Sequence, residues 1–273
     1  MRILVTNDDG IDSLGLHVLA RRLTEIGDVV VVAPDREYSG FGAALGTLHL
    51  MQPEVRRTHI DGVPEAWSVE GPPALCVYFA RFGCFGDIDL VVSGINPGAN
   101  VGRAIYHSGT VGAAITARNG GLNGIAISQS VIGFGVEGQG WDDMIKDQRW
   151  DTAAEVAARV TEAMAKDLPD PAVVVNINVP NVGIEEITAW RHAEVGTTPP
   201  RSVATAVLVP REGYEDTFTV AMDWGEPVEL PIETDGGSVE AGEIAISYLS
   251  RIVHDPGPGM PGVDAVLDEL TSG

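Results

Sequence analysis

Two hydrophobic patterns alternate along residues 1–180 of the chain. Short apolar runs bounded by polar residues or glycine are typical of strands buried on both faces of a sheet. After Ser13, apolar residues recur three and four positions apart from Leu16 to Leu23, which predicts an amphipathic helix. A strand, a helix and a second strand in this order imply a right-handed crossover and a parallel sheet, and hence an α/β protein. The predicted strands are residues 3–5, 29–33, 90–92, 123–128 and 172–178, and further helices begin near residues 71, 108 and 153.

The pattern changes after residue 188. Residues 206–209 and 218–220 are apolar and flank Gly213 and Tyr214, which predicts a β-hairpin. An arm of this kind often packs on a second copy of the chain. We therefore divide the chain into an α/β core of residues 1–187 and a C-terminal arm and tail of residues 188–273 that serves dimerisation. Within the second range, residues 244–246 predict a last strand and residues 263–270 a short helix.

The composition is that of a folded, acidic protein. Hydrophobic residues make up 44% of the 273 positions, which is enough to form a packed core. The formal net charge is −22, so a long nucleic acid is an unfavourable partner. No apolar stretch reaches the roughly 20 residues that cross a membrane, and the chain opens on a strand, so we expect a cytoplasmic protein without a membrane partner. Cys76 and Cys84 are expected to be reduced, in agreement with that location.

Two adjacent carboxylates stand where the first strand gives way to the first helix. Asp8 and Asp9 follow the apolar run, and ligands of open α/β sheets bind at the carboxyl ends of strands. Two neighbouring carboxylates repel each other unless a cation joins them, and oxygen donors favour a hard divalent ion such as Mg²⁺ or Mn²⁺. The alternative is a polar turn, in which Asp9 and Gly10 shape the bend and Asp12 or Ser13 caps the helix. The pattern alone leaves both interpretations open.

Two further loops follow predicted strands and are expected at the same edge of the sheet. Ser39, beside Gly40, offers a hydroxyl oxygen to a metal ion, and Asn96, in a glycine-rich loop, offers an amide oxygen. For Ser39 the local pattern favours an ordinary turn serine, and a turn is also the alternative for Asn96.

The helix predicted to begin after Ser108 is a candidate anion site. Free backbone amides at a helix N-terminus bind anions, and the hydroxyls of Ser108 and Thr110, on either side of Gly109, are further donors. The alternative is an ordinary helix cap with close helix packing. His107 either donates a proton to a leaving group or is structural, and the pattern favours the structural role.

Three common motifs are absent from the sequence. No G-x-G-x-x-G follows the first strand, and no G-x-x-x-x-G-K-[ST] occurs, which disfavours dinucleotide binding and a P-loop NTPase. The six histidines show no metal-binding spacing, which disfavours a zinc hydrolase.

Several motifs together resemble those of the SurE family, the stationary-phase survival proteins that act as metal-dependent nucleotide phosphatases. In order, they are ILVTNDDG at 3–10, APDR at 33–36 with Ser39-Gly40, SGIN at 93–96, SGTVGAA at 108–114 and NINVP at 176–180. The resemblance implies a Rossmann-like, mostly parallel sheet flanked by helices over residues 1–187, and a C-terminal arm exchanged in the dimer. It also implies Asp8, Asp9, Ser39 and Asn96 as metal ligands, and Ser108, Gly109 and Thr110 as the phosphate-binding segment.

We therefore expect a divalent-metal-dependent phosphatase that hydrolyses nucleoside 5′-monophosphates, with 3′-monophosphates as a second substrate class. It would hold one divalent ion per subunit, Mg²⁺ or Mn²⁺, and form a homodimer or homotetramer. Asp8 and Asp9 are the expected catalytic residues, because either can orient a water molecule or take its proton; a covalent aspartyl-phosphate route stays open. The alternatives are a non-catalytic nucleotide-binding module and a phosphatase for another small phosphate ester or polyphosphate.

Overall fold

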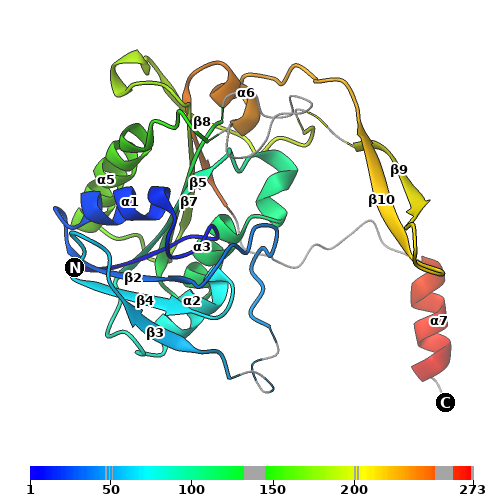
Figure 1. Cartoon of the computed structure of the whole chain (residues 1–273), viewed down its shortest axis with the longest axis horizontal. Coiled ribbons are helices and arrows are strands. Elements are labelled where there is room, and N and C mark those ends of the chain that lie inside the picture. The colour runs from blue at the N-terminus through cyan, green and yellow to red at the C-terminus, as the bar shows by residue number, and fades with distance from the viewer. Residues whose placement is uncertain are drawn as a thin grey trace.

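The computed structural model of the chain describes residues 1–46, 48, 50, 52–131, 145–199, 201, 203–249 and 261–271. The strands are β1 (Arg2–Thr6), β2 (Asp28–Pro34), β3 (Val55–Thr58), β4 (Glu65–Val69), β5 (Leu90–Pro97), β6 (Asn123–Gln129), β7 (Val174–Val179), β8 (Trp190–His192), β9 (Val203–Pro210), β10 (Phe218–Trp224) and β11 (Ile244–Tyr248). The helices are α1 (Leu14–Leu23), α2 (Pro73–Arg81), α3 (Gly109–Asn119), α5 (Trp150–Lys166), α6 (Asp235–Glu240) and α7 (Pro261–Thr271), with 3₁₀ turns η1 (Gly102–Tyr106) and η2 (Ile184–Glu186). Within the described residues, nine strands form one sheet in the order β3-β4-β2-β1-β5-β6-β7-β11-β8 (Figure 1).

Strand β1 lies in the parallel part of the sheet. It pairs in parallel with β2 on one side and with β5 on the other, so that Ile3 lies opposite both Val29 and Leu90. The strands β4, β2, β1, β5, β6 and β7 run the same way, whereas β3 pairs antiparallel with β4, and β11 with β7. Ile3, Leu4 and Val5 are fully buried because helices cover both faces, which explains why this strand is an apolar run. The predicted α/β class with a mostly parallel, Rossmann-like sheet is confirmed.

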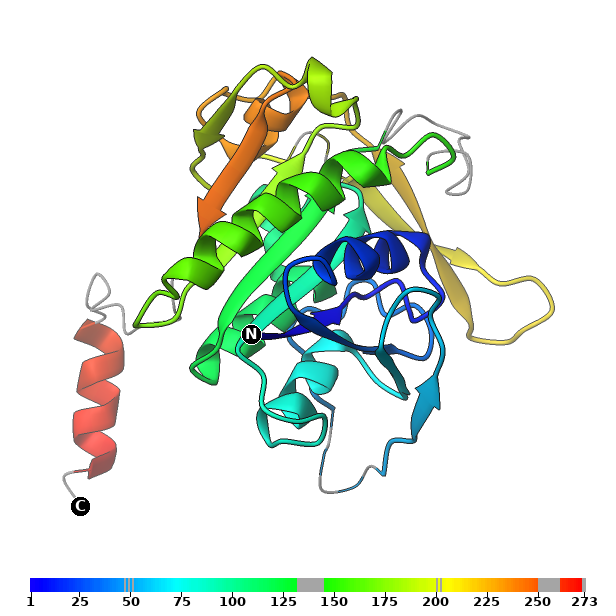
Figure 2. The same cartoon turned by 90° about the vertical axis from the view of Figure 1, so that its left-hand side faces the viewer.

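Helices α1 and α5 cover one face of the sheet, and α2 and α3 cover the other. Figure 2 shows α1 and α5 side by side in front of the strands. Leu16 and Leu19 of α1 belong to one hydrophobic cluster with Ala157 of α5, and Val77 of α2 belongs to another with Ala113 of α3. Each helix in the described part of the chain is too short or too polar to cross a bilayer. This arrangement leaves the carboxyl ends of the parallel strands free to carry the loops that hold the polar residues.

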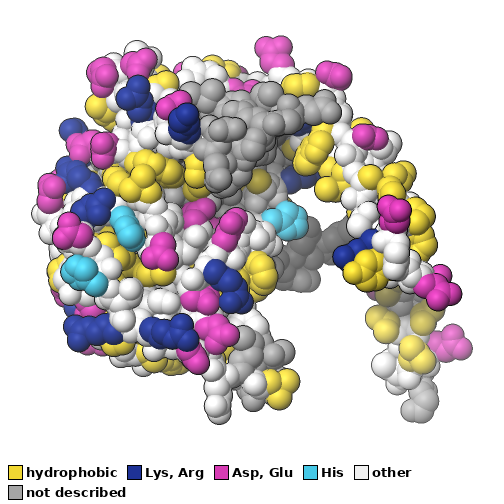
Figure 3. All heavy atoms as spheres, viewed as in Figure 1, with side chains coloured by type: hydrophobic (Ala, Val, Ile, Leu, Met, Phe, Trp, Pro, Cys, Tyr) yellow, Lys and Arg dark blue, Asp and Glu magenta, His cyan; other side chains and the backbone are white. Residues whose placement is uncertain are grey.

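Strands β9 and β10 form an antiparallel hairpin that projects from the rest of the chain (Figure 1). Val207 lies opposite Ala221, and every residue of both strands is exposed. Figure 3 shows hydrophobic side chains gathered along this hairpin and along α7, on the right of the view. The predicted C-terminal β-hairpin is therefore confirmed, and it carries an uncovered apolar surface.

Two strands that follow residue 187 join the main sheet. Strand β11 pairs with β7, with Ile246 opposite Ile177, and the short strand β8 lies beyond it at the edge. The last strand predicted from the sequence is thus β11, and the predicted short helix is α7. The division into residues 1–187 and 188–273 stays a prediction, because the second range contributes strands to both sheets.

Candidate active site

The candidate site lies at the carboxyl ends of three neighbouring strands. Thr6, the last residue of β1, pairs with Ser93 of β5, so the loop of Asp8 leaves the sheet beside the end of β5. The expected loop position of Asn96 is wrong: Asn96 lies within β5, opposite Ser128 of β6. Strand β2 ends at Pro34 on the other side of β1, and its loop carries Ser39. The expectation that these loops share one edge of the sheet is met by this register.

Asp8 faces the N-terminus of α3. The backbone N–H of Gly109 donates to Asp8 Oδ2 at 3.0 Å, and the Thr110 hydroxyl donates to Asp8 Oδ1. Asp8 is only 3% exposed, and this burial raises its pKa, although the hydrogen bond from Thr110 opposes the rise. Ser108 is the N-cap of α3, and its hydroxyl accepts from the N–H of Val111 at 3.1 Å. In this structure the three residues predicted to bind phosphate therefore orient Asp8 and cap α3; their role in phosphate binding stays a prediction.

Asp9 carries a negative charge that the described residues do not balance. Its Oδ2 atom is buried and has no hydrogen-bond partner among the residues that the structure describes. Burial raises the pKa of Asp9 well above the ordinary value, and repulsion from Asp8 and Glu37 raises it further. The amide oxygen of Asn7, on the residue before Asp8, is also buried without a partner in the described part of the chain. A simple polar turn does not account for these unpaired oxygens, because turn residues normally use them to bond the backbone.

Ser39 lies in the loop after β2, and Asn96 lies near the carboxyl end of β5. The N–H of Tyr38 donates to the carbonyl oxygen of Asp8 at 2.7 Å, which holds the loop of the exposed Ser39 against Asp8. The Asn96 amide group donates to the carbonyl of Gly98 at 2.7 Å, so its oxygen is the end of the side chain that faces away from this bond. His107, whose ring is exposed, accepts with its backbone carbonyl from Gly42 at 3.0 Å. This bond gives the histidine a structural role through its backbone.

Small residues at the start of α3 allow very close backbone packing. A Cβ atom added to Gly109 would lie 2.7 Å from the Cβ of Asp8, and one added to Gly112 would lie 2.2 Å from the carbonyl oxygen of Gly42. Real Cβ atoms do not approach other atoms so closely, so only glycine fits at both positions. The small-residue motif therefore brings α3 onto Asp8 and onto the loop that follows β2.

The oxygen atoms at this edge fit a hard divalent cation. Asp8 and Asp9 supply two carboxylates, and a buried, unpartnered oxygen such as Asp9 Oδ2 is a group that a bound cation would satisfy. No cluster of three or more His, Cys, Asp or Glu arranged for a metal is found among the described residues, so a hydroxyl and an amide oxygen would have to complete the ligand set. Ser39 and Asn96 supply these two donor types.

Sequence reasoning missed the contributions of Asn7 and Glu37. Asn7 donates through its amide to the carbonyl of Gly10 at 3.1 Å and is fully buried, so it shapes the loop that carries both aspartates. Glu37 adds a third carboxylate to the field at Asp9. Asn7 was adjacent in the sequence to the chosen pair, whereas Glu37 had no local signal, because its effect depends on how the loop after β2 folds back.

Known proteins resemble this chain over most of its length. The family described as survival protein SurE matches residues 3–201. The 5′-nucleotidase SurE of Haemophilus influenzae (strain ATCC 51907 / DSM 11121 / KW20 / Rd) is 36% identical over 254 residues, which cover 91% of each chain. That of Legionella pneumophila subsp. pneumophila is 39% identical over 198 residues, which cover 72% of this chain and 71% of the relative. The crystal structure of SurE protein from Aquifex aeolicus has a TM-score of 0.71 and 26% identity, and the match covers 99% of both chains. The chain belongs to the SurE family.

Proposed function

We propose that this chain is a divalent-metal-dependent phosphatase that hydrolyses nucleoside 5′-monophosphates, and 3′-monophosphates as a second class, to nucleoside and phosphate. The observation that carries the proposal is the adjacent carboxylates of Asp8, which is buried, and Asp9, whose buried Oδ2 atom has no hydrogen-bond partner among the described residues. Membership of the SurE family, whose relatives above are named 5′-nucleotidases, supports the reaction and the substrate class.

In this proposal Asp8, Asp9, Ser39 and Asn96 hold one divalent ion, Mg²⁺ or Mn²⁺. When bound, the ion supplies Lewis acidity at a phosphate oxygen and lowers the pKa of a water molecule. The fixed oxygens of Asp8 hold the ligand set in place, because Gly109 and Thr110 donate to both of them.

Asp9 is the general base of the proposed reaction. Its buried Oδ2 atom accepts no hydrogen bond from the described residues, so this oxygen can accept the proton of a water molecule. The water oxygen forms a bond to phosphorus, the ester P–O bond breaks, and the proton removed by Asp9 is returned to the leaving oxygen. We propose water as the nucleophile because both oxygens of Asp8 already accept hydrogen bonds.

The N-terminus of α3 is the proposed place for the phosphate group. The helix carries partial positive charge there, and Ser108, Gly109 and Thr110 present hydroxyl and amide groups at this end. These donors would be shared between Asp8 and the phosphate, so substrate binding and carboxylate orientation depend on the same turn.

The decisive experiment is a substrate panel at matched metal concentration. We expect phosphate release from AMP with Mn²⁺ or Mg²⁺, none with EDTA, and recovery when the metal is restored. 3′-AMP, inorganic polyphosphate and p-nitrophenyl phosphate are the comparison substrates. Binding of AMP without phosphate release would show a nucleotide-binding module instead. Faster release from polyphosphate than from every nucleotide would reject the proposed substrate class.

We also propose that the chain forms a homodimer or homotetramer through the hairpin β9–β10. Its apolar side chains have no cover within the described chain: Leu208 is 69% exposed and Val220 is 58% exposed. Burial of such a surface stabilises an assembly by about 25 cal/mol per Å² of apolar area. Light scattering at micromolar concentration should give a multiple of the chain mass of 28.8 kDa. A fully active monomer would reject this assembly.

A further inference from the structure

Asp235 is a fully buried carboxylate that the proposed reaction does not use. It stands at the first position of α6 and is 0% exposed. Its Oδ2 accepts from the N–H of Gly102 at 2.9 Å, and its Oδ1 accepts from the N–H groups of Gly196 at 3.0 Å and Gly236 at 2.9 Å. These amides replace the water that the carboxylate loses on burial, and hydrogen bonds to a charged acceptor are about twice as strong as neutral ones.

The three amides belong to parts of the chain that are far apart in sequence. Gly102 begins η1, which follows the Asn96 segment and leads to Ser108. Gly196 precedes β9 and is the root of the hairpin. A Cβ added to Gly102 would lie 2.9 Å from the carbonyl oxygen of Gly196, so the two backbones are in direct contact beneath Asp235. One carboxylate therefore joins a loop of the candidate site to the start of the projecting arm.

The segment from Asn96 to Ser108 has other anchors as well: the N–H of Gly98 donates to the carbonyl of Gln129 at 2.7 Å, and the carbonyl of His107 accepts from the N–H of Gly42 at 3.0 Å. Asn100 adds bonds to β7. The Asn100 N–H donates to Asn178 Oδ1 at 2.7 Å, and its carbonyl accepts from Asn176 Nδ2 at 2.9 Å. These bonds fix the first half of the segment to β7. The second half, which leads through η1 to the cap of α3, is held by Asp235 at Gly102 and by the N–H of Gly42 at His107.

We propose that Asp235 is a positioning residue that couples the root of the β9–β10 hairpin to the candidate active site, so that the placement of Ser108 depends on it. The inference rests on the proposed phosphatase function. Asn has the same shape as Asp but places an NH₂ group where one carboxylate oxygen stood. That group cannot accept from an N–H, so Asp235→Asn leaves a buried backbone amide unpaired and releases the segment.

The test compares Asp235→Asn with Ser238→Ala in the full-length, metal-loaded protein. Ser238 is a matched control because it is fully buried on the same helix and donates to Ile232 and Thr234, with no hydrogen bond to Gly102. Misplacement of site groups by ~1 Å costs up to ~100-fold in rate, so we expect kcat for AMP to fall about tenfold or more in Asp235→Asn. Ser238→Ala should keep the parent kcat at a temperature where both variants are folded.

A second set of measurements tests the coupling without an activity assay. Amide hydrogen exchange should accelerate at residues 98–108 and 194–197 in Asp235→Asn and stay at the parent rate in Ser238→Ala. The Mn²⁺ concentration that gives half of the thermal stabilisation should also rise in Asp235→Asn alone. If Asp235→Asn does not fold, Gly102→Ala disturbs the same contact from the other side and takes its place.

The outcomes separate the two proposals. Unchanged exchange at residues 98–108 with an unchanged Mn²⁺ midpoint overturns the role of Asp235, whether or not the protein is a phosphatase. Equal losses of kcat in Asp235→Asn and Ser238→Ala would also overturn it, because α6 would then act only through stability. A parent protein that releases no phosphate from any substrate rejects the proposed function, while the exchange measurement still decides the coupling.

Discussion

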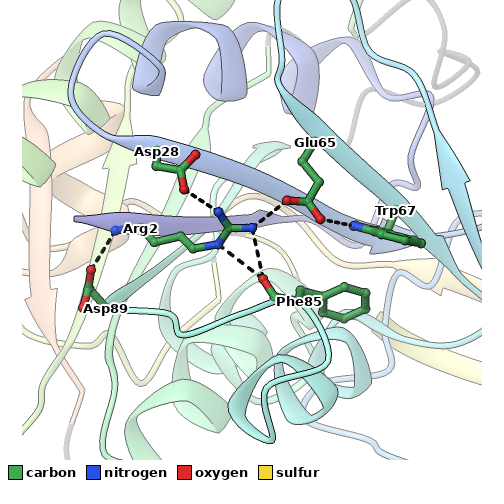
Figure 4. A network of polar contacts seen from close by, with 6 residues as sticks. All are labelled: Arg2, Asp28, Glu65, Trp67, Phe85 and Asp89. Carbon is green, nitrogen blue, oxygen red and sulfur yellow. Dashed lines mark hydrogen bonds and ion pairs between the residues drawn. The ribbon is translucent and has the colours of Figure 1, made fainter.

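The charged side chains near the two ends of β1 differ in their partners. At its amino end, Arg2 pairs with Asp28, donates to Glu65 at 2.6 Å and to the carbonyl of Phe85 at 3.1 Å, and its N–H donates to Asp89 (Figure 4). At its carboxyl end, Asp8 and Asp9 have only neutral donors or none. The first region is at the start of β1, and the second is in the loop that follows it.

The pKa values of Glu65 and Asp9 are shifted in opposite directions. Burial would raise the pKa of Glu65, but the hydrogen bonds from Trp67 and Arg2 outweigh it and hold the pKa below the ordinary value. For Asp9, burial and repulsion from Asp8 act together and raise the pKa. The amino end therefore stabilises the fold at neutral pH, whereas the carboxyl end costs stability. Such a concentration of uncompensated charge is typical of functional sites.

The largest expected effect is loss of activity at the carboxyl end. Asp8→Asn and Asp9→Asn each remove a negative ligand, and we expect AMP hydrolysis to fall more than about a hundredfold, because loss of even an outer-shell partner of a metal ligand costs about 10–100-fold. Melting curves with and without Mn²⁺ should show that the variants lose the stabilisation that metal gives the parent. Asp12→Asn, an exposed acid in the same loop, is the control. If the variants hydrolyse AMP at the parent rate, the site is misplaced.

The next effect is a loss of stability at the amino end. Arg2→Met removes charged hydrogen bonds to Glu65 and Phe85, and we expect the free energy of unfolding to fall by about 2 kcal/mol. Because the change is remote from the candidate site, kcat should stay at the parent value below the melting temperature. Arg56→Met, whose side chain is 70% exposed in its pair with Glu54, should change stability by less than about 1 kcal/mol in the same denaturant titration. Equal losses in both variants would contradict the special role of Arg2.

A smaller effect of opposite sign is expected for Asp9→Asn without metal. The raised pKa means that the folded chain binds this proton more tightly than the unfolded chain does. Stability therefore falls as pH rises from about 3.9, the ordinary Asp value, through the raised pKa, and stays lower above it. Asparagine removes this loss, so in EDTA at neutral pH the Tm should rise by about 2–4 °C, which corresponds to about 1 kcal/mol in a chain of this size.

The matching measurement at the amino end is the pH dependence of the melting temperature of Glu65→Gln. Because the pKa of Glu65 is lowered in the folded state, its contribution is present above the unfolded pKa and is lost as pH falls through the folded pKa. The difference in melting temperature between the parent and each variant, measured in EDTA across the acidic range, should therefore change with pH in opposite directions for Glu65→Gln and Asp9→Asn. Slopes of the same sign would remove the contrast.

The smallest effect concerns the hydroxyl that steadies Asp8. Thr110→Val removes a hydrogen bond that lowers the pKa of Asp8, so that pKa should rise and the acid limb of the kcat/KM profile should move to higher pH. Stability should change by only about 1 kcal/mol. Thr110→Ser keeps the hydroxyl and should keep the parent profile. A profile that does not move in Thr110→Val would show that the hydroxyl does not influence Asp8.

Local pattern was sufficient to predict the parallel core and the position of its first loop. The run from Ile3 to Val5 and the polar residues after it are adjacent in sequence, so the strand end and both aspartates could be read together. The hairpin was also predictable, because its two apolar runs flank Gly213. These features depend on hydrophobic periodicity and turn chemistry, which act over a few residues.

Long-range pairing was beyond sequence reasoning. The bonds from Gly109 and Thr110 to Asp8 join residues more than a hundred positions apart, so donors that seemed free for phosphate are already used by the carboxylate. Strand β8 has only three residues and forms because β11 lies beside it. The burial of Asp235 likewise depends on where the hairpin root meets η1.

The acidic surface also governs how fast an anionic molecule reaches the site. The chain carries a formal net charge of −22, so a phosphate ester is repelled as it approaches. Dissolved salt shortens the range of this repulsion, from about 30 Å at 0.01 M to about 8 Å at 0.15 M. Encounter with a nucleotide is therefore faster at the ionic strength of a cell than in dilute buffer, the reverse of the salt dependence shown by enzymes whose surfaces attract their substrates.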